Sequence, residues 1–237
     1  MPAVERYGLR VTLLAIALAL VGIPFGFLLQ QVLAEGPLTR LDLAGARWLH
    51  LLVVEHPVAV VALELVSFTG KPIFLTVVIG ALSLWLLRHG HRKLVAFLVV
   101  TSVGGGVVDS IVKVAVGRSR PEFDEPVATA FGNSFPSGHS MSSLICYGAV
   151  LLVLLPVLPV PLRRPAIVGT GLLVLAIGTS RLALGVHFVS DVAGGYVLGA
   201  AWLAASVAAF EIWREERGRR RTHPLTEGMD PEVATGT

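Results

Sequence analysis

Long apolar runs dominate the chain and alternate with short polar or basic segments. A transmembrane helix needs roughly 20 apolar residues, and six runs approach or exceed that length: residues 11–33, 72–87, 94–116, 140–158, 165–184 and 192–213. The pattern predicts an all-α fold, a polytopic membrane helix bundle with six transmembrane helices. The run 72–87 is short, so it must tilt little, thin the bilayer or extend back past Lys71, with that side chain snorkelling to the interface.

The segment between the first and second runs has a different pattern. Residues 38–69 are apolar only in patches and carry several ionisable residues, namely Arg40, Asp42, Arg47, His50, Glu55, His56 and Glu64. This mixture predicts two amphipathic helices that lie on the membrane interface or dip into it. A transmembrane segment at 57–68 is the alternative that the pattern leaves open.

The first run, 11–33, also occupies the place of a signal peptide, with Val32-Leu33-Ala34 as a cleavage site. Its apolar stretch is longer than the roughly 7 to 15 residues of a signal-peptide core. We therefore expect an uncleaved membrane anchor.

Composition agrees with a membrane protein. Of 237 residues, 54% are hydrophobic and 15% are charged, whereas about a quarter are charged in an ordinary soluble domain. Extensive disorder is excluded by the same apolar content. We expect one integral-membrane domain over 1–213 and a disordered basic cytoplasmic tail over 214–237, either attracted to anionic headgroups or simply solubilising.

The distribution of basic residues predicts the topology. The net charge is +3, but the basic residues form short clusters between apolar runs, which argues for membrane topology and against nucleic-acid binding. The clusters are Arg6 and Arg10; Arg88, Arg92 and Lys93; Arg163 and Arg164; and Arg214, Arg217, Arg219, Arg220 and Arg221. All of them fall on one face, which the positive-inside rule makes cytoplasmic. Both termini are then cytoplasmic, and the loops 117–135 and 185–187 face outward.

Metal and disulfide chemistry find no support in the sequence. The single cysteine, Cys146, lies in an apolar run, so an intramolecular disulfide is not possible. No Cys/His cluster has the spacing of zinc ligands. We expect no metal and no cofactor.

Charged residues at membrane depth are costly and are functional candidates by default. They gather at the outer ends of the third to sixth runs. The first group is Lys113-x6-Arg120-Pro121, with Asp109 one helical turn before Lys113. On their own, Lys113 and Arg120 could equally snorkel to the interface.

The second group is Pro136-Ser137-Gly138-His139, at the start of the fourth run. Ser137 or Ser134 suits the helix cap, and Gly138 lets a ligand approach the backbone. The free N–H groups and the helix dipole there favour an anion. His139 is placed to exchange a proton with whatever binds, although an interfacial histidine beside a cap is the simpler interpretation of this group alone.

The third group is Ser180-Arg181-x5-His187-x3-Asp191. His187 and Asp191 are four residues apart at the start of the last run, so they share a helix face. A carboxylate there fixes the imidazole tautomer and makes the other ring nitrogen a better nucleophile. Taken together, the three groups bring the cations Lys113, Arg120 and Arg181 to one membrane face, where a phosphate would match them in charge and geometry.

These three motifs, in this order, resemble the pattern of the type 2 phosphatidic acid phosphatase superfamily, K-x6-RP, PSGH and SR-x5-H-x3-D, with no departure at those positions. The resemblance implies metal-independent hydrolysis of a lipid phosphate through a phosphohistidine. It implies that His187 attacks phosphorus with help from Asp191, while His139 protonates the departing oxygen and later activates water. Phosphate oxygens would be held by Lys113, Arg120, Ser137, Gly138 and Arg181.

Several alternatives stay open within this resemblance. The substrate could be phosphatidic acid, phosphatidylglycerol phosphate or a polyprenyl pyrophosphate, because nothing in 113–191 separates a monophosphate from a diphosphate. A phosphotransferase would use the same phosphohistidine. An anion transporter or a lipid-binding protein without activity are the non-enzymatic alternatives, and the oligomeric state is not predicted.

Glycine and phenylalanine residues near the motifs have predicted packing roles. Gly195 and Gly199 form a GxxxG pair, which is typical of close helix packing. Gly104, Gly105 and Gly106 are expected to let the third run approach the sixth or a lipid chain. Phe131 and Phe135 flank the site and are expected to line the lipid entrance or to anchor at the interface.

Overall fold

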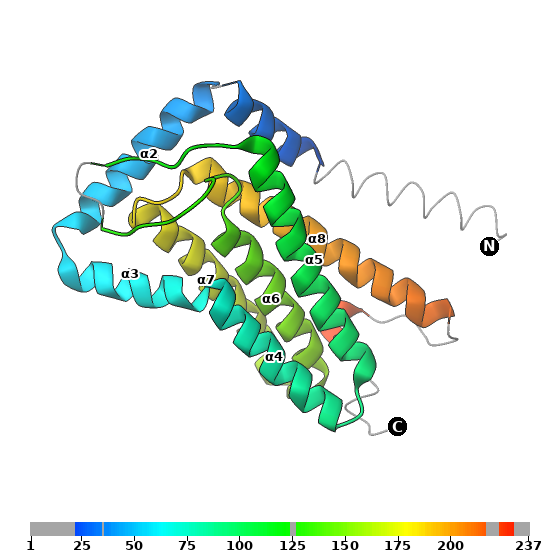
Figure 1. Ribbon diagram of the computed structural model, residues 1–237. Coiled ribbons are helices and arrows are strands. Elements are labelled where there is room, and N and C mark those ends of the chain that lie inside the picture. Colours follow the sequence, from blue (N-terminus) through cyan, green and yellow to red (C-terminus); the bar gives the residue numbers. More distant parts are fainter. Residues whose placement is uncertain (1–21, 35, 124–126, 217–222, 230–237) are drawn as a thin grey trace.

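The computed structural model describes residues 22–34, 36–123, 127–216 and 223–229, and these ranges contain helices and no strand. A helical stretch, Gly22–Leu33, precedes α2. The elements that follow are α2 (Pro37–Val54), α3 (Pro57–Thr69), α4 (Pro72–Arg88), α5 (Arg92–Val116), α6 (Gly138–Leu154), the 3-10 turn η1 (Leu155–Val157), α7 (Val160–Ala183), α8 (Val189–Glu216) and the short α9 (Pro224–Glu227) (Figure 1).

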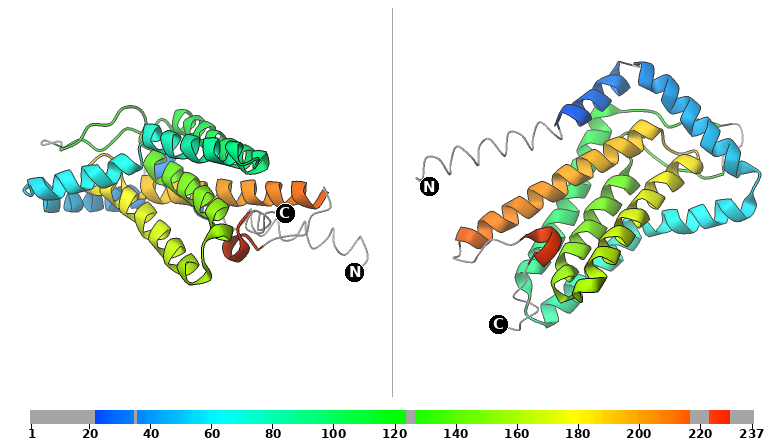
Figure 2. Two further views of the ribbon diagram at one scale, coloured as in Figure 1. Left: turned by 90° about the horizontal axis from the view of Figure 1, so that it is seen from below. Right: turned by 180° about the vertical axis from the view of Figure 1, so that it is seen from behind.

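Helix α6 is the centre of the bundle. It contacts α4, α5, α7 and α8, and the two views of Figure 2 also place it among them. Its buried face includes Met141, Ile145 and Ala149, each at most 1% exposed. The first residues of α6, which contain the second motif, therefore start from the middle of the bundle.

Close approach of α8 to α6 depends on the GxxxG pair. A Cβ at Gly195 would lie 2.6 Å from the carbonyl oxygen of Ser137, and one at Gly199 would lie 3.1 Å from that of Met141. The predicted packing role is confirmed. Glycines of α5 act similarly, because a Cβ at Gly104 or Gly105 would press on Trp202 of α8.

The helices define a multi-pass membrane protein of the predicted all-α class. Within the described residues, α5, α6 with η1, α7 and α8 are long and apolar enough to cross a membrane. Helix α4, with 17 residues, is shorter. Residues 11–21 of the first predicted run lie outside the described residues, so the count of six spans stays a prediction.

The segment 38–69 forms two helices, as predicted. Helices α2 and α3 meet at an angle of 119° and would form a single broken span only as a pair. The break falls at Glu55 and His56, just before Pro57, whose ring cannot continue a helix. Both helices pack on α7, and α2 also reaches α8, so together they cover the end of the bundle where the three motifs lie (Figure 1).

Basic residues occupy the opposite end. Arg88 ends α4, Arg92 begins α5, and Arg163 and Arg164 lie in the first turn and a half of α7. Lys93 lies 5.5 Å from the ring of Trp213 near the end of α8. The described members of the predicted clusters thus lie at one end of the bundle, and the side of the membrane that this end faces stays a prediction. The remaining members, Arg6, Arg10, Arg217, Arg219, Arg220 and Arg221, lie outside the described residues.

Part of the predicted disordered tail is packed. Residues 214–216 continue α8, and residues 223–229 dock on the end of α6. The amide of Met229 donates to the Leu152 carbonyl over 3.0 Å, and the Met229 side chain is fully buried. Arg163 donates to the Thr226 carbonyl over 2.6 Å. A methionine in a basic segment gives too weak a signal for this docking to be predicted. Residues 217–222 and 230–237 lie outside the described residues.

Candidate active site

The three predicted motifs converge where α5, α6, α7 and α8 meet. Lys113 lies in the last turn of α5 and His139 in the first turn of α6, while Arg181 closes α7 and Asp191 opens α8. Arg120 lies in the loop after α5, and His187 in the turn between α7 and α8. His139, of the second motif, is within electrostatic range of Lys113 of the first motif and of Arg181 and His187 of the third.

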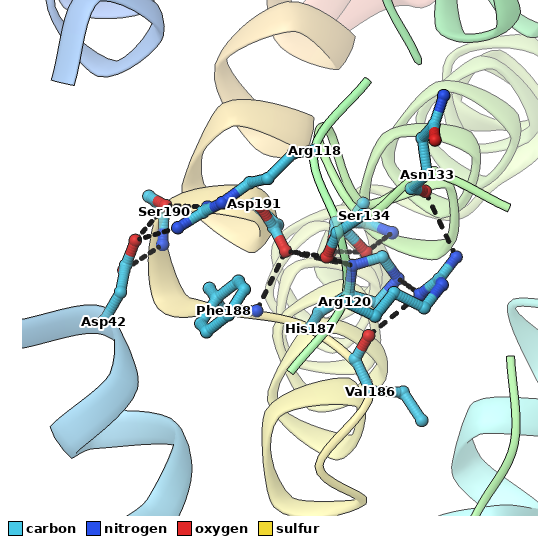
Figure 3. Close-up of polar contacts among 12 residues, drawn as sticks. Asp42, Arg118, Arg120, Asn133, Ser134, Val186, His187, Phe188, Ser190 and Asp191 are labelled. Atoms are coloured by element: carbon cyan, nitrogen blue, oxygen red, sulfur yellow. Dashed lines mark hydrogen bonds and ion pairs between the residues drawn. The ribbon is translucent and has the colours of Figure 1, made fainter. Parts of the chain in front are cut away.

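His187 and Asp191 form the buried centre of this arrangement (Figure 3). His187 is 2% exposed and Asp191 is fully buried. The imidazole Nδ1 lies 3.3 Å from Asp191 Oδ2. The same oxygen accepts hydrogen bonds from the Phe188 amide at 2.9 Å and from the Ser134 hydroxyl. The carboxylate is thus held in one orientation by the Phe188 amide, just before α8, and by Ser134, in the loop before α6.

Arg120 fixes the tautomer of His187. Its Nη1 lies 3.0 Å from His187 Nε2, and a guanidinium only donates hydrogen bonds. The Nε2 lone pair is therefore the acceptor, and the proton is on Nδ1, directed at Asp191. Backbone carbonyls of Val186, Gly132 and Phe131 accept from Arg120 at 2.8, 2.9 and 3.1 Å and hold the guanidinium over the imidazole.

The electrostatics of the site keep His187 neutral. Burial lowers the pKa of His187 from 6.5 to about 4, although the hydrogen bond and charge of Asp191 act in the opposite direction. The positive charges of Arg120 and Arg181 lower this pKa further. Burial also lowers the pKa of Arg120 from its ordinary value, with Asp191 opposing the shift. An unprotonated imidazole beside fixed cations has the charge state that a nucleophile toward an anion requires.

The ammonium of Lys113 lies against the start of α6, at Gly138. Its Nζ lies 2.5 Å from Asp109 Oδ1, the predicted i,i+4 pair. A Cβ at Gly138 would lie only 3.0 Å from that ammonium, so glycine leaves the space in which Lys113 lies. Ser137 is the cap residue of α6, with its hydroxyl 3.5 Å from the Ser140 amide.

Two buried polar atoms at the site have no hydrogen-bond partner in the described structure. They are Nε2 of His139 and Nε of Arg181. Arg181 is 6% exposed, and its Nη1 donates to the Ser67 hydroxyl of α3 over 2.7 Å. Because buried polar groups are normally paired, these two atoms indicate places where a polar ligand would bind.

A second network of polar residues was not predicted. Arg118 Nη1 donates to Asp191 Oδ1 over 2.6 Å and to the Ser190 hydroxyl over 2.7 Å. Its Nη2 lies 3.0 Å from Oδ2 of Asp42, in α2. Asp42 also accepts the Ser190 amide at 2.8 Å. Sequence patterns did not indicate this network, because Asp42 and Arg118 are 76 residues apart and Asp42 resembled the polar face of an interfacial helix.

The two phenylalanines that were expected to flank the site differ. Phe131 is 95% exposed, so an entrance or interfacial role remains compatible with its position. Phe135 is fully buried, and a Cβ at Gly194 would lie 2.7 Å from its ring. For Phe135 the expectation is wrong, because the glycine of α8 leaves a space that the ring fills.

Two adjoining cavities open beside the cations. One, of about 440 Å³, is lined by Arg120, Phe123, Gly185 and Val186. The other, of about 420 Å³, is lined by Arg181 and residues of α3. They share Ala128, Thr129 and Leu184. No group of three His, Cys, Asp or Glu side chains suited to a metal ion occurs in the part of the chain that the structure describes.

Fold and site together define a polytopic membrane protein with a histidine–aspartate pair among fixed cations. The PAP2 superfamily model matches residues 93–215, and the chain belongs to the PAP2 superfamily. The match includes all three motifs, α5 to α8 and the loop that carries Arg118 and Arg120.

Relatives of this chain include named lipid phosphatases. Phosphatidylglycerophosphatase B of Bacillus subtilis (strain 168) is 35% identical over 127 residues, which cover 53% of this chain and 61% of that protein. Lipid A 1-phosphatase of Rhizobium johnstonii is 30% identical over 122 residues, covering 48% of this chain and 46% of that protein. The chain thus spans less than two thirds of the length of the relatives that it matches.

A solved structure has the same fold. The crystal structure of a transmembrane PAP2 type phosphatidylglycerolphosphate phosphatase from Bacillus subtilis aligns with a TM-score of 0.68 at 24% identity. The alignment covers 84% of this chain and 97% of that chain. It supports the arrangement of the helices over most of the chain.

Proposed function

We propose that this protein hydrolyses a lipid phosphate, without a metal ion, through a phosphohistidine on His187. The observation that carries the proposal is the buried dyad, in which Asp191 holds Nδ1 and the Nε2 lone pair points at Arg120. Family membership and the names of the relatives support a phosphatase acting on lipids. The roles of the motif residues below are part of the proposal.

In the first step the Nε2 lone pair of His187 attacks phosphorus as the bond from phosphorus to the lipid oxygen breaks. His139 gives its proton to that oxygen, so the lipid leaves as an alcohol, or as a lipid monophosphate when the substrate is a diphosphate. In the structure the guanidinium of Arg120 lies beside Nε2. When substrate binds, this guanidinium shifts to donate to a phosphate oxygen. Lys113, Arg181, Ser137 and the backbone of Gly138 hold the other oxygens, where they stabilise the charge of the transition state.

In the second step a water molecule attacks the phosphohistidine. His139, left neutral by the first step, takes the proton from water as the phosphorus–nitrogen bond breaks. Inorganic phosphate leaves, and His187 regains its lone pair at Nε2. Both histidines return to their starting protonation states, so the cycle balances without an added reactant.

The substrate is proposed to come from the outer leaflet. Basic residues gather at the end of the bundle opposite the site, and they support a cytoplasmic position for that end. Both termini and the tail 214–237 would then be cytoplasmic, and the site of the integral-membrane domain 1–213 would be extracytoplasmic. The relatives' names, phosphatidylglycerophosphatase and lipid A 1-phosphatase, favour a lipid phosphate over a soluble phosphate.

Phosphate release in excess EDTA tests this proposal. Detergent-purified protein is assayed against phosphatidic acid, phosphatidylglycerol phosphate and a polyprenyl pyrophosphate, with His187→Ala beside wild type. Release that persists in EDTA and falls at least about 100-fold in the variant is expected, since loss of a nucleophile typically costs this much or more. The variant His89→Ala, at the opposite end of the bundle, is the matched control and should retain wild-type activity.

The same assay separates the alternatives. Release that depends on an added alcohol acceptor would indicate a phosphotransferase using the same intermediate. Equal release by wild type and His187→Ala would contradict the role of His187. No release from any lipid, with or without an acceptor, would favour an anion transporter or a lipid-binding protein.

A further inference from the structure

A polar cavity lies on the α3 side of the proposed site, outside the three motifs. Its volume is about 420 Å³, and its lining includes two cations, a buried hydroxyl and one carboxylate, those of Lys71, Arg181, Ser67 and Glu64. The mechanism proposed above uses Arg181 only. It gives the remainder of the cavity no role.

Arg181 is shared by this cavity and the proposed phosphate site. Its side chain is buried, with 6% of its surface exposed, and its Nη1 donates a hydrogen bond to the Ser67 hydroxyl of α3. Its Nε has no partner in the described structure. One guanidinium therefore lines the cavity while belonging to the cation set that surrounds His139 and His187.

Lys71 supplies a second positive charge to the cavity from the junction of α3 and α4. Its backbone is fixed, because its amide donates to Phe68 and its carbonyl accepts from Leu75, both at 3.0 Å. The ammonium lies 5.5 Å from the centre of the Phe68 ring. Neither Glu64 nor any other described carboxylate forms an ion pair with it.

The position of Lys71 relative to the two histidines indicates which part of a substrate it would meet. The residue before it, Gly70, lies against His139, because a Cβ at Gly70 would be 3.2 Å from Cδ2 of that ring. His139 is the group that we assign to the departing oxygen. The partners of Asp191, by contrast, are Arg118, Ser134 and the Phe188 amide, on the nucleophile's side. Lys71 is therefore on the side of the leaving group.

We propose that Lys71 and this cavity form a subsite for a second phosphate, carried by the leaving part of the lipid. The inference rests on the proposed function and extends it to substrate choice. In phosphatidic acid the leaving alcohol is uncharged and makes no use of Lys71. In a polyprenyl pyrophosphate, or in phosphatidylglycerol phosphate, the leaving group carries an anionic phosphate that binds the ammonium.

The test compares substrates with and without the second phosphate. Lys71→Ala, Lys71→Arg and the control Lys93→Ala are purified in detergent and assayed on phosphatidic acid, phosphatidylglycerol phosphate and a polyprenyl pyrophosphate. Lys93 is the matched control because it is a lysine at the opposite end of the bundle. For Lys71→Ala we expect kcat/KM to fall about 5- to 10-fold on at least one doubly phosphorylated lipid, the loss of one partly screened charge pair. Phosphatidic acid should change less than about 2-fold, and Lys71→Arg should restore the loss.

The substrate that loses most identifies the source of the second phosphate. A pyrophosphate places it directly beside the scissile bond, whereas phosphatidylglycerol phosphate places it beyond a glycerol. An equal loss on phosphatidic acid, or no loss on any lipid, would overturn the subsite. Failure of wild-type protein to release phosphate from all three lipids would instead overturn the proposed function, and the subsite with it.

Discussion

At the scale of single residues, the site consists of a buried pair whose orientation is determined from both sides. Asp191 accepts from His187, Ser134 and the Phe188 amide on one oxygen and from Arg118 on the other. Arg120 lies against the far nitrogen of His187. Two sets of variants test the charge state and the orientation of this pair.

The pH dependence of kcat/KM should report the low pKa of His187. Protonation removes the Nε2 lone pair, so activity is lost as the pH falls through about 4, and it should not depend on this group near pH 6.5. Because the charge of Arg120 helps to lower this pKa, Arg120→Gln should move the acid limb to higher pH. The lipid's own ionisation contributes equally in both proteins. An acid limb that stays in place in the variant would contradict the assignment to His187.

Arg118 and Asp42 are expected to position Asp191 without touching the substrate. Arg118→Gln and Asp42→Asn should each lower kcat by about 10- to 100-fold, the range for disrupting a buried charge network of roughly 1.5 to 3 kcal/mol. KM should change little. The double variant should lose less than the product of the two effects, because the residues act as a unit. Steady-state kinetics of these variants and of Arg47→Gln, an exposed arginine on α2, provide the test; a rise in KM at constant kcat would assign them to substrate binding.

At the scale of the elements, the apolar runs predicted α5 to α8 closely, because a lipid-solvated helix must be continuously apolar. The motif residues were also predicted, since charged side chains at membrane depth stand out. The contact of α2 with the site was not predicted. Asp42 is the single aspartate of this helix, and in the sequence it looks solvent-exposed because its partner, Arg118, is far away along the chain. The docking of Met229 was not predicted for the same reason, because its partner, Leu152 in α6, is far away along the chain.

The contact between α6 and α8 gives a prediction at this scale. Gly195→Val places a side chain 2.6 Å from a backbone oxygen of α6 and should destabilise the protein by about 1 to 3 kcal/mol, the usual cost of overpacking. Thermal unfolding in detergent measures the change. Gly106→Ala is the control, since a Cβ there meets nothing within 4 Å. Equal unfolding temperatures for both variants would contradict a packing role for Gly195.

At the scale of the whole molecule, basic residues gather at the two ends of the bundle, and the two groups have different proposed roles. The cations of the proposed phosphate site, Lys113, Arg120 and Arg181, lie at or just beyond the ends of α5 and α7. At the opposite end of the bundle lie Arg88, Arg92, Arg163 and Arg164. An anion transporter would need cations along a path between the faces. In the described residues, the cations proposed to bind phosphate, Lys113, Arg120 and Arg181, instead gather at one end of the bundle. This placement favours a site that lipids reach from one leaflet.

Cysteine labelling tests this topology. Thr129 is exposed in the loop beside the site, and Arg88 is exposed at the opposite end. With Cys146 replaced by serine, Thr129→Cys should react with a membrane-impermeant maleimide on intact cells. Arg88→Cys should react only after permeabilisation. The reverse pattern would place the site in the cytoplasm.

The central claim is that phosphorus becomes bonded to His187. The most direct measurement is mass spectrometry of peptides from protein mixed with its lipid phosphate and quenched within one turnover, using wild type and His187→Ala. We expect a phosphoryl group on the peptide that contains His187, and none anywhere in the variant. A phosphorylated residue elsewhere in wild type, or steady phosphate release by the variant with no adduct, would contradict the mechanism.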